Sequence, residues 1–289
     1  MAYKGKRINP QKFERSQIKI IILILPLVIF MAMPLIFIAN HAFKPMEELF
    51  AFPPTFFVRN ATMDNFTKLI KFSRTAGIPL SRYVFNSIIV TVLTVGLSLL
   101  FTTCAAFALA KIKFKGRNLM MQINQIALMF VAVAVLIPRY LVVCQLGMID
   151  SIWAHILPLV AYPVALFLVK QFVEQVPDSL IEAAYMDGAT DMQVYWKLIL
   201  PMIKPAIATA SILVFQQVWT NMETSNYYIN ADNMKTLTFY MNTLVNANNT
   251  VSGQGIAAAA TLIMFVPNLV LFIILQNSVM NTMAHSGIK

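Results

Sequence analysis

Residues Pro177–Pro205 read PDSLIEAAYMDGATDMQVYWKLILPMIKP, a polar segment in a chain that is otherwise strongly apolar. Ser179 is followed three residues later by Glu182, which is the spacing of a capping box at the start of a helix. Thr190 is followed by Gln193 at the same spacing. The segment therefore predicts two short helices, one after the other.

A glycine separates the two predicted helices. Gly188 can adopt the left-handed backbone conformation that commonly ends a helix, and Pro201 is predicted to halt or kink the chain beyond the second helix. Each helix has an apolar side, formed by Leu180, Ile181, Ala184 and Tyr185 and by Met192, Tyr195, Trp196 and Ile199. The acidic residues predicted to be exposed are Glu182, Asp187 and Asp191.

This segment resembles the EAA loop of permease subunits of binding-protein-dependent ABC importers. The matching residues, in the family's spacing, are Glu182, Ala183, Ala184, Gly188, Leu198, Leu200 and Pro201, although the family usually has isoleucine where Leu198 stands. Asp187-Gly188-Ala189 is similar to the carbohydrate-uptake branch, and the chain resembles the maltose-type second permease. The resemblance implies that the loop is the socket for an ATPase subunit, with coupling residues Glu182, Ala183, Ala184, Asp187, Gly188, Ala189, Leu200 and Pro201. The alternative is an ordinary amphipathic cytoplasmic hairpin.

Composition indicates an integral membrane protein. Of the 289 residues, 58% are hydrophobic and 12% are charged, whereas soluble domains carry roughly one-quarter charged residues. Apolar runs predict six spans, at about residues 18–38, 84–110, 120–143, 152–169, 203–219 and 256–275. The predicted fold class is an all-α, polytopic membrane protein. Residues 18–289 form its transmembrane domain, which the resemblance implies is an ABC importer permease bundle, with residues 177–205 as the coupling loop.

Basic residues predict the orientation of the spans. The formal net charge is +10, but the basic residues lie mainly beside apolar runs, which is typical of topology signals and not of a nucleic-acid-binding face. Residues 1–17 form a basic tail, and Lys111, Lys113, Lys115 and Arg117 follow the second span. The link Gln145–Ser151 has no Lys or Arg. Both termini and the coupling loop are therefore predicted to be cytoplasmic, and the link extracytoplasmic.

The first long loop counts against this orientation. The loop of residues 39–82, which the same orientation places outside, also carries six basic residues. We weigh the short loops more heavily because charge bias is most informative there. The cluster after the second span could also bind anionic lipid of the bilayer.

The sequence offers no enzyme chemistry. It contains no GxxxxGK[S/T] motif, so we predict that this chain has no catalytic residues and no cofactor of its own, with ATP and Mg on a partner ATPase. The three histidines lie in separate segments without metal-ligand spacing, and His155 is interpreted as an interfacial residue. Cys104 and Cys144 are predicted to differ too much in depth for a disulfide and to act as small packing residues.

None of the six predicted spans contains Asp or Glu. Ion-coupled carriers usually place ionisable groups at mid-membrane, so this absence favours a pore whose energy comes from outside the membrane. The alternatives are a stand-alone channel or secondary carrier, and a membrane scaffold that transports nothing.

Sugar recognition requires hydrogen-bonding groups and flat aromatic faces. The candidates for the solute pathway are Gln216, Gln217, Trp219 and Asn221 at the end of span five, with Asn86 in span two and Asn268 in span six. The family often has Trp-Asn where this chain has Trp219-Thr220. For each candidate the alternative is a hydrogen bond between helices or an interface anchor. Arg139 is predicted to snorkel to the outer interface, with a role in drawing an acidic sugar as the weaker alternative.

The resemblance also implies a set of partners. These are a second, non-identical permease subunit, an ATPase subunit dimer and an extracytoplasmic solute-binding protein. The solute would be a sugar or oligosaccharide, and the location would be the bacterial cytoplasmic (inner) membrane. No nucleic-acid partner is predicted.

Overall fold

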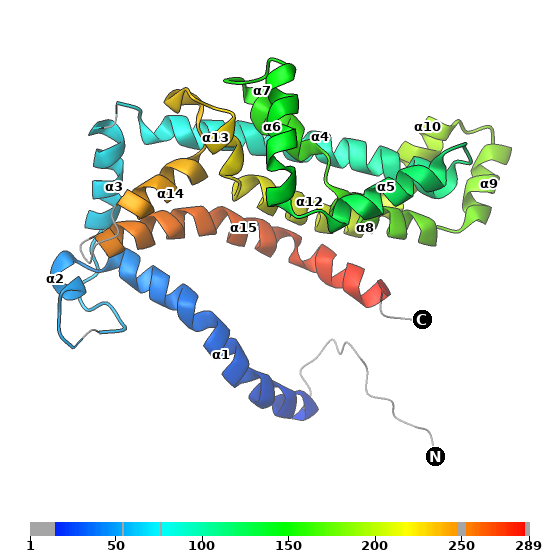
Figure 1. Ribbon diagram of the computed structural model, residues 1–289. Coiled ribbons are helices and arrows are strands. Elements are labelled where there is room, and N and C mark those ends of the chain that lie inside the picture. Colours follow the sequence, from blue (N-terminus) through cyan, green and yellow to red (C-terminus); the bar gives the residue numbers. More distant parts are fainter. Residues whose placement is uncertain (1–14, 54, 76, 248–252, 287–289) are drawn as a thin grey trace.

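The computed structural model describes residues 15–53, 55–75, 77–247 and 253–286, and the regular elements in that part of the chain are helices (Figure 1). The predicted basic tail of residues 1–17 falls almost wholly outside it. Three helices contain apolar stretches long enough to cross a membrane unaided, namely α1 (Arg15–Phe43), α4 (Leu80–Lys111) and α15 (Gln254–Ser286).

The remaining predicted spans are interrupted helices. They are built from α5 (Arg117–Met129), η1 (Ala132–Val135) and α6 (Leu136–Gln145); α7 (Ile152–Val160) and α8 (Pro163–Gln175); and the helical segment 191–202 followed by α12 (Lys204–Trp219). Each pair bends by more than 40°, and the described part of the chain has up to six spans if each pair counts as one. Three of the six predicted spans are therefore bent helices and not straight ones.

Prolines account for two of these interruptions. Tyr162 has extended backbone angles, φ −116° and ψ 98°, because the proline ring of Pro163 disfavours a helical conformation in the preceding residue. The bend before α12 lies at Ile203, two residues before Pro205. Pro201 was predicted to halt or kink the chain, and the helical segment ends one residue later with α11 (Leu200–Met202), where the chain bends by 80° into α12.

Helix α4 is the centre of the bundle and packs against α7, α8, α12 and α14. Its buried face carries small hydroxyl residues, which are Ser87, Thr91, Thr94, Ser98, Thr102 and Thr103. Small residues let neighbouring helices approach closely in a membrane. Helix α1 packs chiefly against α15 and leaves most of its apolar surface exposed, with Leu23 at 80%.

The segment Asn221–Gly255, between the fifth and sixth predicted spans, contains three helical elements in its described part. They are α13 (Glu223–Tyr227), η3 (Asp232–Met234) and α14 (Leu237–Ala247). Asp150, in the link between α6 and α7, joins this segment by accepting hydrogen bonds from the backbone of Asn230 at 2.5 Å and Ala231 at 3.0 Å. These bonds hold the pKa of the Asp150 carboxyl below its usual value. The segment is therefore an ordered cap rather than a loose loop.

The first long loop is also folded. It contains α2 (Met46–Leu49) and α3 (Asp64–Thr75), which lie at the opposite end of α4 from α9 and α10 (Figure 1). Lys44 in this loop is 2% exposed and donates a hydrogen bond to the backbone oxygen of Thr55. At least one of the loop's six basic side chains is thus internal to the loop and does not face its surface.

The two cysteines are free and both are exposed. Exposure of Cys144, on α6, contradicts its interpretation as a packing residue. Cys104, on α4, is also exposed, but its side chain reaches the hydroxyl of the buried Tyr195.

Candidate coupling hairpin and solute pathway

The segment 177–205 forms a helical hairpin. Helix α9 (Asp178–Met186) is followed by Gly188 with φ +82°, and α10 (Asp191–Gln193) begins immediately after the turn. The Thr190 hydroxyl accepts a hydrogen bond from the backbone of Gln193 at 3.4 Å, and the Gln193 side chain accepts one from the backbone of Thr190 at 2.9 Å. The predicted glycine turn and the second capping box are confirmed.

The first predicted capping box is wrong. Helix α9 begins at Asp178, directly after Pro177, and its N-terminal cap has no side-chain hydrogen bond. Ser179 is consequently the second residue inside the helix and lies two positions after the cap residue, Pro177. The sequence pattern misplaced the helix start because Asp178 can itself occupy the first turn, where a carboxylate is favourable near the helix N-terminus.

Both arms of the hairpin are attached to α4. The Lys111 ammonium group, at the end of α4, donates to Asp178 Oδ1 at 2.7 Å and to the Val176 backbone oxygen at 2.6 Å. The Tyr195 hydroxyl, in the π-helical segment η2 (Val194–Ile199), is 2.8 Å from the hydroxyl of Thr103 in a buried contact. A displacement of either arm must therefore move α4 or break one of these contacts.

A further bond ties the arms to each other. The Tyr185 hydroxyl on α9 donates to Asp191 Oδ1 on α10 at 2.7 Å. This hydrogen bond to Asp191 raises the pKa of Tyr185, so the phenol stays protonated and keeps donating. The two arms are therefore joined next to the turn by a side-chain hydrogen bond as well as by the chain itself.

The two faces of the hairpin differ in character. Ile181, Val194, Tyr195 and Ile199 are buried in the main apolar core. The opposite face exposes large apolar side chains, namely Leu180, Met186, Met192 and Trp196, with Met186 at 88%. Tyr185 is exposed at the edge of α9 that lies toward the end of α4. Glu182, Asp187 and Asp191 are also exposed. An exposed apolar patch with a charged rim is typical of a surface that binds another protein.

The other predicted coupling residues lie on or near this surface. Ala183 and Pro201 are exposed, whereas Ala184, Ala189 and Leu200 are partly buried against the core. The structure therefore brings the predicted residues together on one hairpin. Their coupling role stays a prediction.

Three of the six predicted solute residues are engaged within the protein. The Asn86 amide donates to the backbone oxygens of Asn233 at 2.9 Å and Lys235 at 3.0 Å. The Trp219 indole donates to the Met264 oxygen at 3.0 Å, and Asn221 Oδ1 accepts from the backbone and side chain of Thr224. These bonds favour the alternative of structural hydrogen bonds for all three.

The other three have unused polar atoms. Gln216 is exposed on α12. Among the described residues, the side-chain oxygens of Gln217 on α12 and Asn268 on α15 are buried and find no partner, as do the hydroxyls of Thr94 and Ser98 on α4. Helix α12 packs against both α4 and α15. The geometry thus places unsatisfied polar atoms on α12 and on the two helices that pack against it.

Two residues take roles that the sequence did not reveal. His155 was predicted to be interfacial but is 1% exposed, with Nδ1 2.8 Å from the Thr224 hydroxyl and Nε2 3.2 Å from the Met234 oxygen. Arg139 was predicted to snorkel but pairs with Glu223 at 2.6 Å. Within the described residues no group of three or more His, Cys, Asp or Glu side chains is arranged to hold a metal ion.

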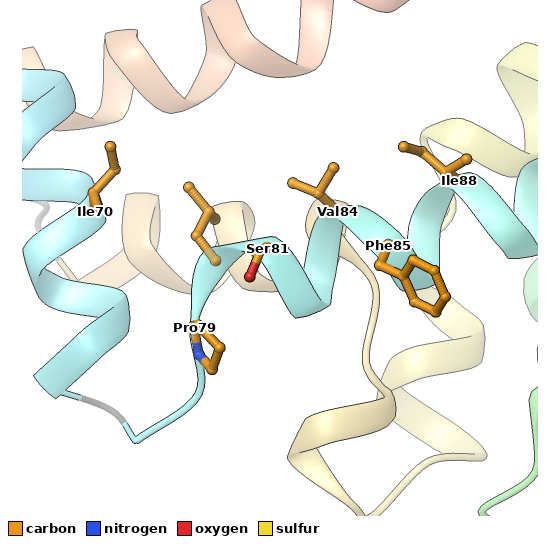
Figure 2. Close-up of a pocket in the computed structure, with 7 residues that line it drawn as sticks. Ile70, Pro79, Ser81, Val84, Phe85 and Ile88 are labelled. Carbon is orange, nitrogen blue, oxygen red and sulfur yellow. The ribbon is translucent and has the colours of Figure 1, made fainter.

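A cavity of about 610 Å³ lies away from these polar groups, between α3 and the start of α4 (Figure 2). It is lined by Ile70, Pro79, Leu80, Ser81, Val84, Phe85 and Ile88. Ser81 is the one hydroxyl residue in this lining, and none of the predicted solute residues belongs to it. The cavity therefore gives no support to a sugar site at that position.

Comparison with known proteins places the chain in a family. Residues 98–279 match the model described as "binding-protein-dependent transport system inner membrane component", and this match contains the whole hairpin. The chain belongs to this family. It is therefore a permease subunit of a transport system, and the six-span permease fold expected from the apolar runs and the family resemblance is the fold that it has.

Named relatives agree with this assignment. The permease is 34% identical over 206 residues to Protein LplC of Bacillus subtilis strain 168, covering 68% of this chain and 65% of LplC, just under two thirds of its length. It is 25% identical to the arabinooligosaccharides transport system permease protein AraQ of the same strain, covering 98% and 99% of the two chains. The AraQ protein of Halalkalibacterium halodurans is 29% identical, with 89% and 90% covered.

A solved structure shows the same fold. It is the crystal structure of a bacterial ABC transporter involved in the import of the acidic polysaccharide alginate. The similarity has a TM-score of 0.77 over 93% of this permease and 99% of that chain, at 23% identity. At that identity the comparison establishes the fold alone.

Proposed function

We propose that this permease is one transmembrane subunit of an ATP-driven importer for a sugar or oligosaccharide. The other parts would be a second, non-identical permease, two ATPase subunits and an extracytoplasmic solute-binding protein. This chain would lie in the bacterial cytoplasmic membrane with its termini and the hairpin 177–205 on the cytoplasmic side. Family membership supports the transport role, and the AraQ relatives support a saccharide as the solute.

The observation that carries the proposal is the two-sided hairpin. Its inner face is fixed in the core by Val194 and Ile199, each at most 1% exposed, while Met186 and Trp196 point away from the protein at 88% and 53%. Leaving large apolar side chains in water costs about 1.5–3 kcal/mol each relative to burying them. A partner that covers this surface would recover that free energy, and an ATPase subunit is the partner that the family implies.

The attachments of the hairpin suggest how movement would be transmitted. Closure of the ATPases would push α9, and α9 is joined to α4 through Lys111 and Asp178. At its other end α4 is joined to the outer cap, where the Ser87 hydroxyl accepts a hydrogen bond from the backbone of Leu237 at 2.7 Å. Helix α4 would therefore transmit a displacement from the exposed face of the hairpin to the segment 221–255. Rocking of the bundle would then open the solute pathway alternately to the two sides of the membrane.

The solute would pass beside the unsatisfied polar atoms of α4, α12 and α15. Gln217 and Asn268 each retain a buried side-chain oxygen that can accept a hydrogen bond from a sugar hydroxyl. Arg139 is already paired with Glu223, so the reason for assigning it to an acidic sugar is removed.

Reconstitution tests the proposal. The permease would be co-expressed with the ATPase, second permease and binding protein encoded beside its gene, and the complex placed in proteoliposomes. We expect ATP-dependent uptake of labelled arabinan oligosaccharides or of another member of a saccharide panel. A complex whose ATPase lacks its phosphate-binding lysine is the control. ATP-independent uptake by the permease alone would instead identify a stand-alone carrier.

A further inference from the structure

We propose that two cavities at the turn between α4 and α5 bind the headgroup of an anionic phospholipid. The first has a volume of about 380 Å³ and lies between the end of α4 and the coupling helix α9. The second, of about 290 Å³, follows the turn itself. Lys113 and Arg117 line both cavities, so the two spaces share one basic wall.

The backbone of the turn creates this shared wall. Gly116 has φ +95°, a conformation that side-chain-bearing residues rarely adopt, and it reverses the chain just before α5 begins. The reversal brings Lys113 and Arg117 to the same space although they are four residues apart outside a helix. Arg117 is held there because its Nη2 donates to the Ala110 backbone oxygen at 3.1 Å.

The balance of charge favours an anion. The first cavity is lined by three basic residues, Lys111, Lys113 and Arg117, and by two carboxylates, those of Asp178 and Glu182, so its formal charge is positive. Asp178 is paired with Lys111 at 2.7 Å and also lies within the field of Lys113. Among the described residues Lys113 forms no hydrogen bond or ion pair. The lining of the second cavity contains no acidic residue. Most donors of the Arg117 guanidinium remain available, and its fork matches the oxygens of a phosphate.

The surroundings favour a lipid phosphate over a free one. Helix α4 contains an apolar stretch long enough to cross a membrane and ends at Lys111, and a basic turn directly after an apolar span is typical of the headgroup level. Phe114 and Leu119 line the second cavity and are 39% and 60% exposed. These side chains offer contact to the glycerol and upper acyl carbons that accompany a lipid phosphate.

A lipid in this position would support the docking surface. Ile181, Glu182 and Tyr185 of α9 form the far wall of the first cavity, and the same helix carries the exposed face of the hairpin. The bound headgroup would fill the space behind α9 and offset the repulsion between Lys113 and Arg117. Placement in the inner leaflet rests on the orientation proposed above, but lipid binding itself does not depend on transport.

The test counts retained lipid. The full-length chain within its complex is placed in nanodiscs of phosphatidylglycerol and phosphatidylcholine, and native mass spectrometry measures the phosphatidylglycerol that remains bound. We expect Lys113→Gln and Arg117→Gln each to lower retention about fivefold, because a basic side chain near an anionic lipid surface contributes about 1 kcal/mol. Lys115→Gln, an exposed neighbour that lines neither cavity, is the matched control and should retain the lipid like the wild type.

Each other outcome overturns the proposal. Equal losses at all three positions would show a diffuse basic surface instead of a cavity site. Inorganic phosphate that raises the Tm of the purified chain as much as phosphatidylglycerol would show that a free anion is the ligand. Lipid that is retained by the two permeases alone but is absent from the complex with its ATPase subunits would assign the cavity to the protein interface. Arg117→Lys keeps the charge, so its retention separates a binding defect from a folding defect.

Discussion

The ammonium group of Lys111, the last residue of α4, lies 2.7 Å from the carboxylate of Asp178, the first residue of α9. The two side chains differ in their exposure to solvent, because that of Lys111 is 8% exposed and that of Asp178 is 76% exposed. Water can replace the lysine as a partner of the aspartate. Water has less access to the Val176 backbone oxygen, which accepts the second bond from Lys111.

This asymmetry predicts that Lys111→Met is more harmful than Asp178→Asn. Loss of the lysine leaves a carbonyl oxygen in a confined site without its donor, at a cost of about 1–3 kcal/mol. We expect Lys111→Met to lower ATP-dependent uptake strongly and Asp178→Asn to lower it mildly, with membrane abundance unchanged in both. Uptake per assembled complex in proteoliposomes measures the difference, with the exposed Lys115→Met as control. A larger defect in Asp178→Asn would contradict this account.

The same pair predicts how coupling depends on pH. Lys111 holds the pKa of Asp178 below its usual value, first through their hydrogen bond. A carboxyl whose pKa is depressed in the folded protein contributes stability above its unfolded pKa and loses it as pH falls through the folded value. Between about pH 5 and pH 8 the aspartate is ionised throughout. Association with the ATPase should therefore not change in this window through Asp178, and a decline centred near neutral pH would assign the titration to another group.

The starts of α9 and α10 provide a matched pair of capping variants. Thr190 caps α10, whereas Ser179 lies inside α9 and caps nothing. Thr190→Ala should cost about 1 kcal/mol of local helix stability and reduce ATPase co-purification, whereas Ser179→Ala should be silent. Quantitative co-purification from mild detergent compares the two. Equal defects would mean that Ser179 contributes to the partner surface directly.

Gly188 predicts a backbone effect that can be separated from a steric one. Its φ is +82°, and a Cβ placed there would meet no atom within 4 Å, so the strain of a substitution lies in the backbone. Gly188→Val should therefore disturb the turn more than Gly188→Asn, because asparagine tolerates the left-handed conformation. We expect valine to abolish ATPase association without loss of the chain from the membrane, and asparagine to keep part of it. If asparagine is as harmful as valine, the partner itself requires space at this position.

Local signals in the sequence identified part of this structure. Gly188 and the Thr190–Gln193 box are determined by residues within one helical turn of one another, and both were predicted. The cap of α9 was misplaced by two residues because Asp178 and Ser179 are both acceptable near a helix N-terminus. The break at Tyr162 was missed because apolar composition measures the length of a span and not its continuity. The bend at Ile203 lies where the fifth span was predicted to begin, two residues after the predicted stop at Pro201.

Contacts between residues far apart in the chain have no local signal in the sequence. Arg139 and Glu223 are 84 residues apart, and His155 and Thr224 are 69 apart. Each residue alone looked like an interfacial polar group. Only the packing of α6 and α7 beside α13 shows that they are partners. The same limit applied to Asn86, whose amide is satisfied by backbone atoms about 150 residues away.

The orientation of the bundle predicts a labelling pattern. Lys113 and Leu146 lie on opposite sides of the membrane if the basic cluster is cytoplasmic. Cys104 and Cys144 are exposed and must first be replaced by alanine. Leu146 is 64% exposed and suits a reporter cysteine better than Gly147, whose φ is +66°. In intact cells an impermeant thiol reagent should label Leu146→Cys and spare Lys113→Cys. The reverse pattern would invert the topology and remove the hairpin from the reach of cytoplasmic ATPases.

The solute pathway yields a prediction that divides the polar candidates into two groups. Gln217 and Asn268 keep buried side-chain oxygens without partners among the described residues, so they are free to accept hydrogen bonds from a sugar. Asn86 donates two hydrogen bonds to backbone oxygens of the outer cap. Substitution in the first group should therefore change transport, and substitution of Asn86 should change stability.

Measurements of uptake and of Tm distinguish these effects. Gln217→Ala and Asn268→Ala should lower saccharide uptake while the Tm of the complex and its solute-independent ATPase activity stay near wild type. Asn86→Ala should lower the Tm, because two backbone carbonyls lose their donor at about 1–3 kcal/mol for each unsatisfied group. Gln216→Ala, at an exposed position on the same helix as Gln217, shows whether the pathway extends to the surface of α12. Full uptake in all three glutamine and asparagine variants of α12 and α15 would move solute recognition to the partner permease.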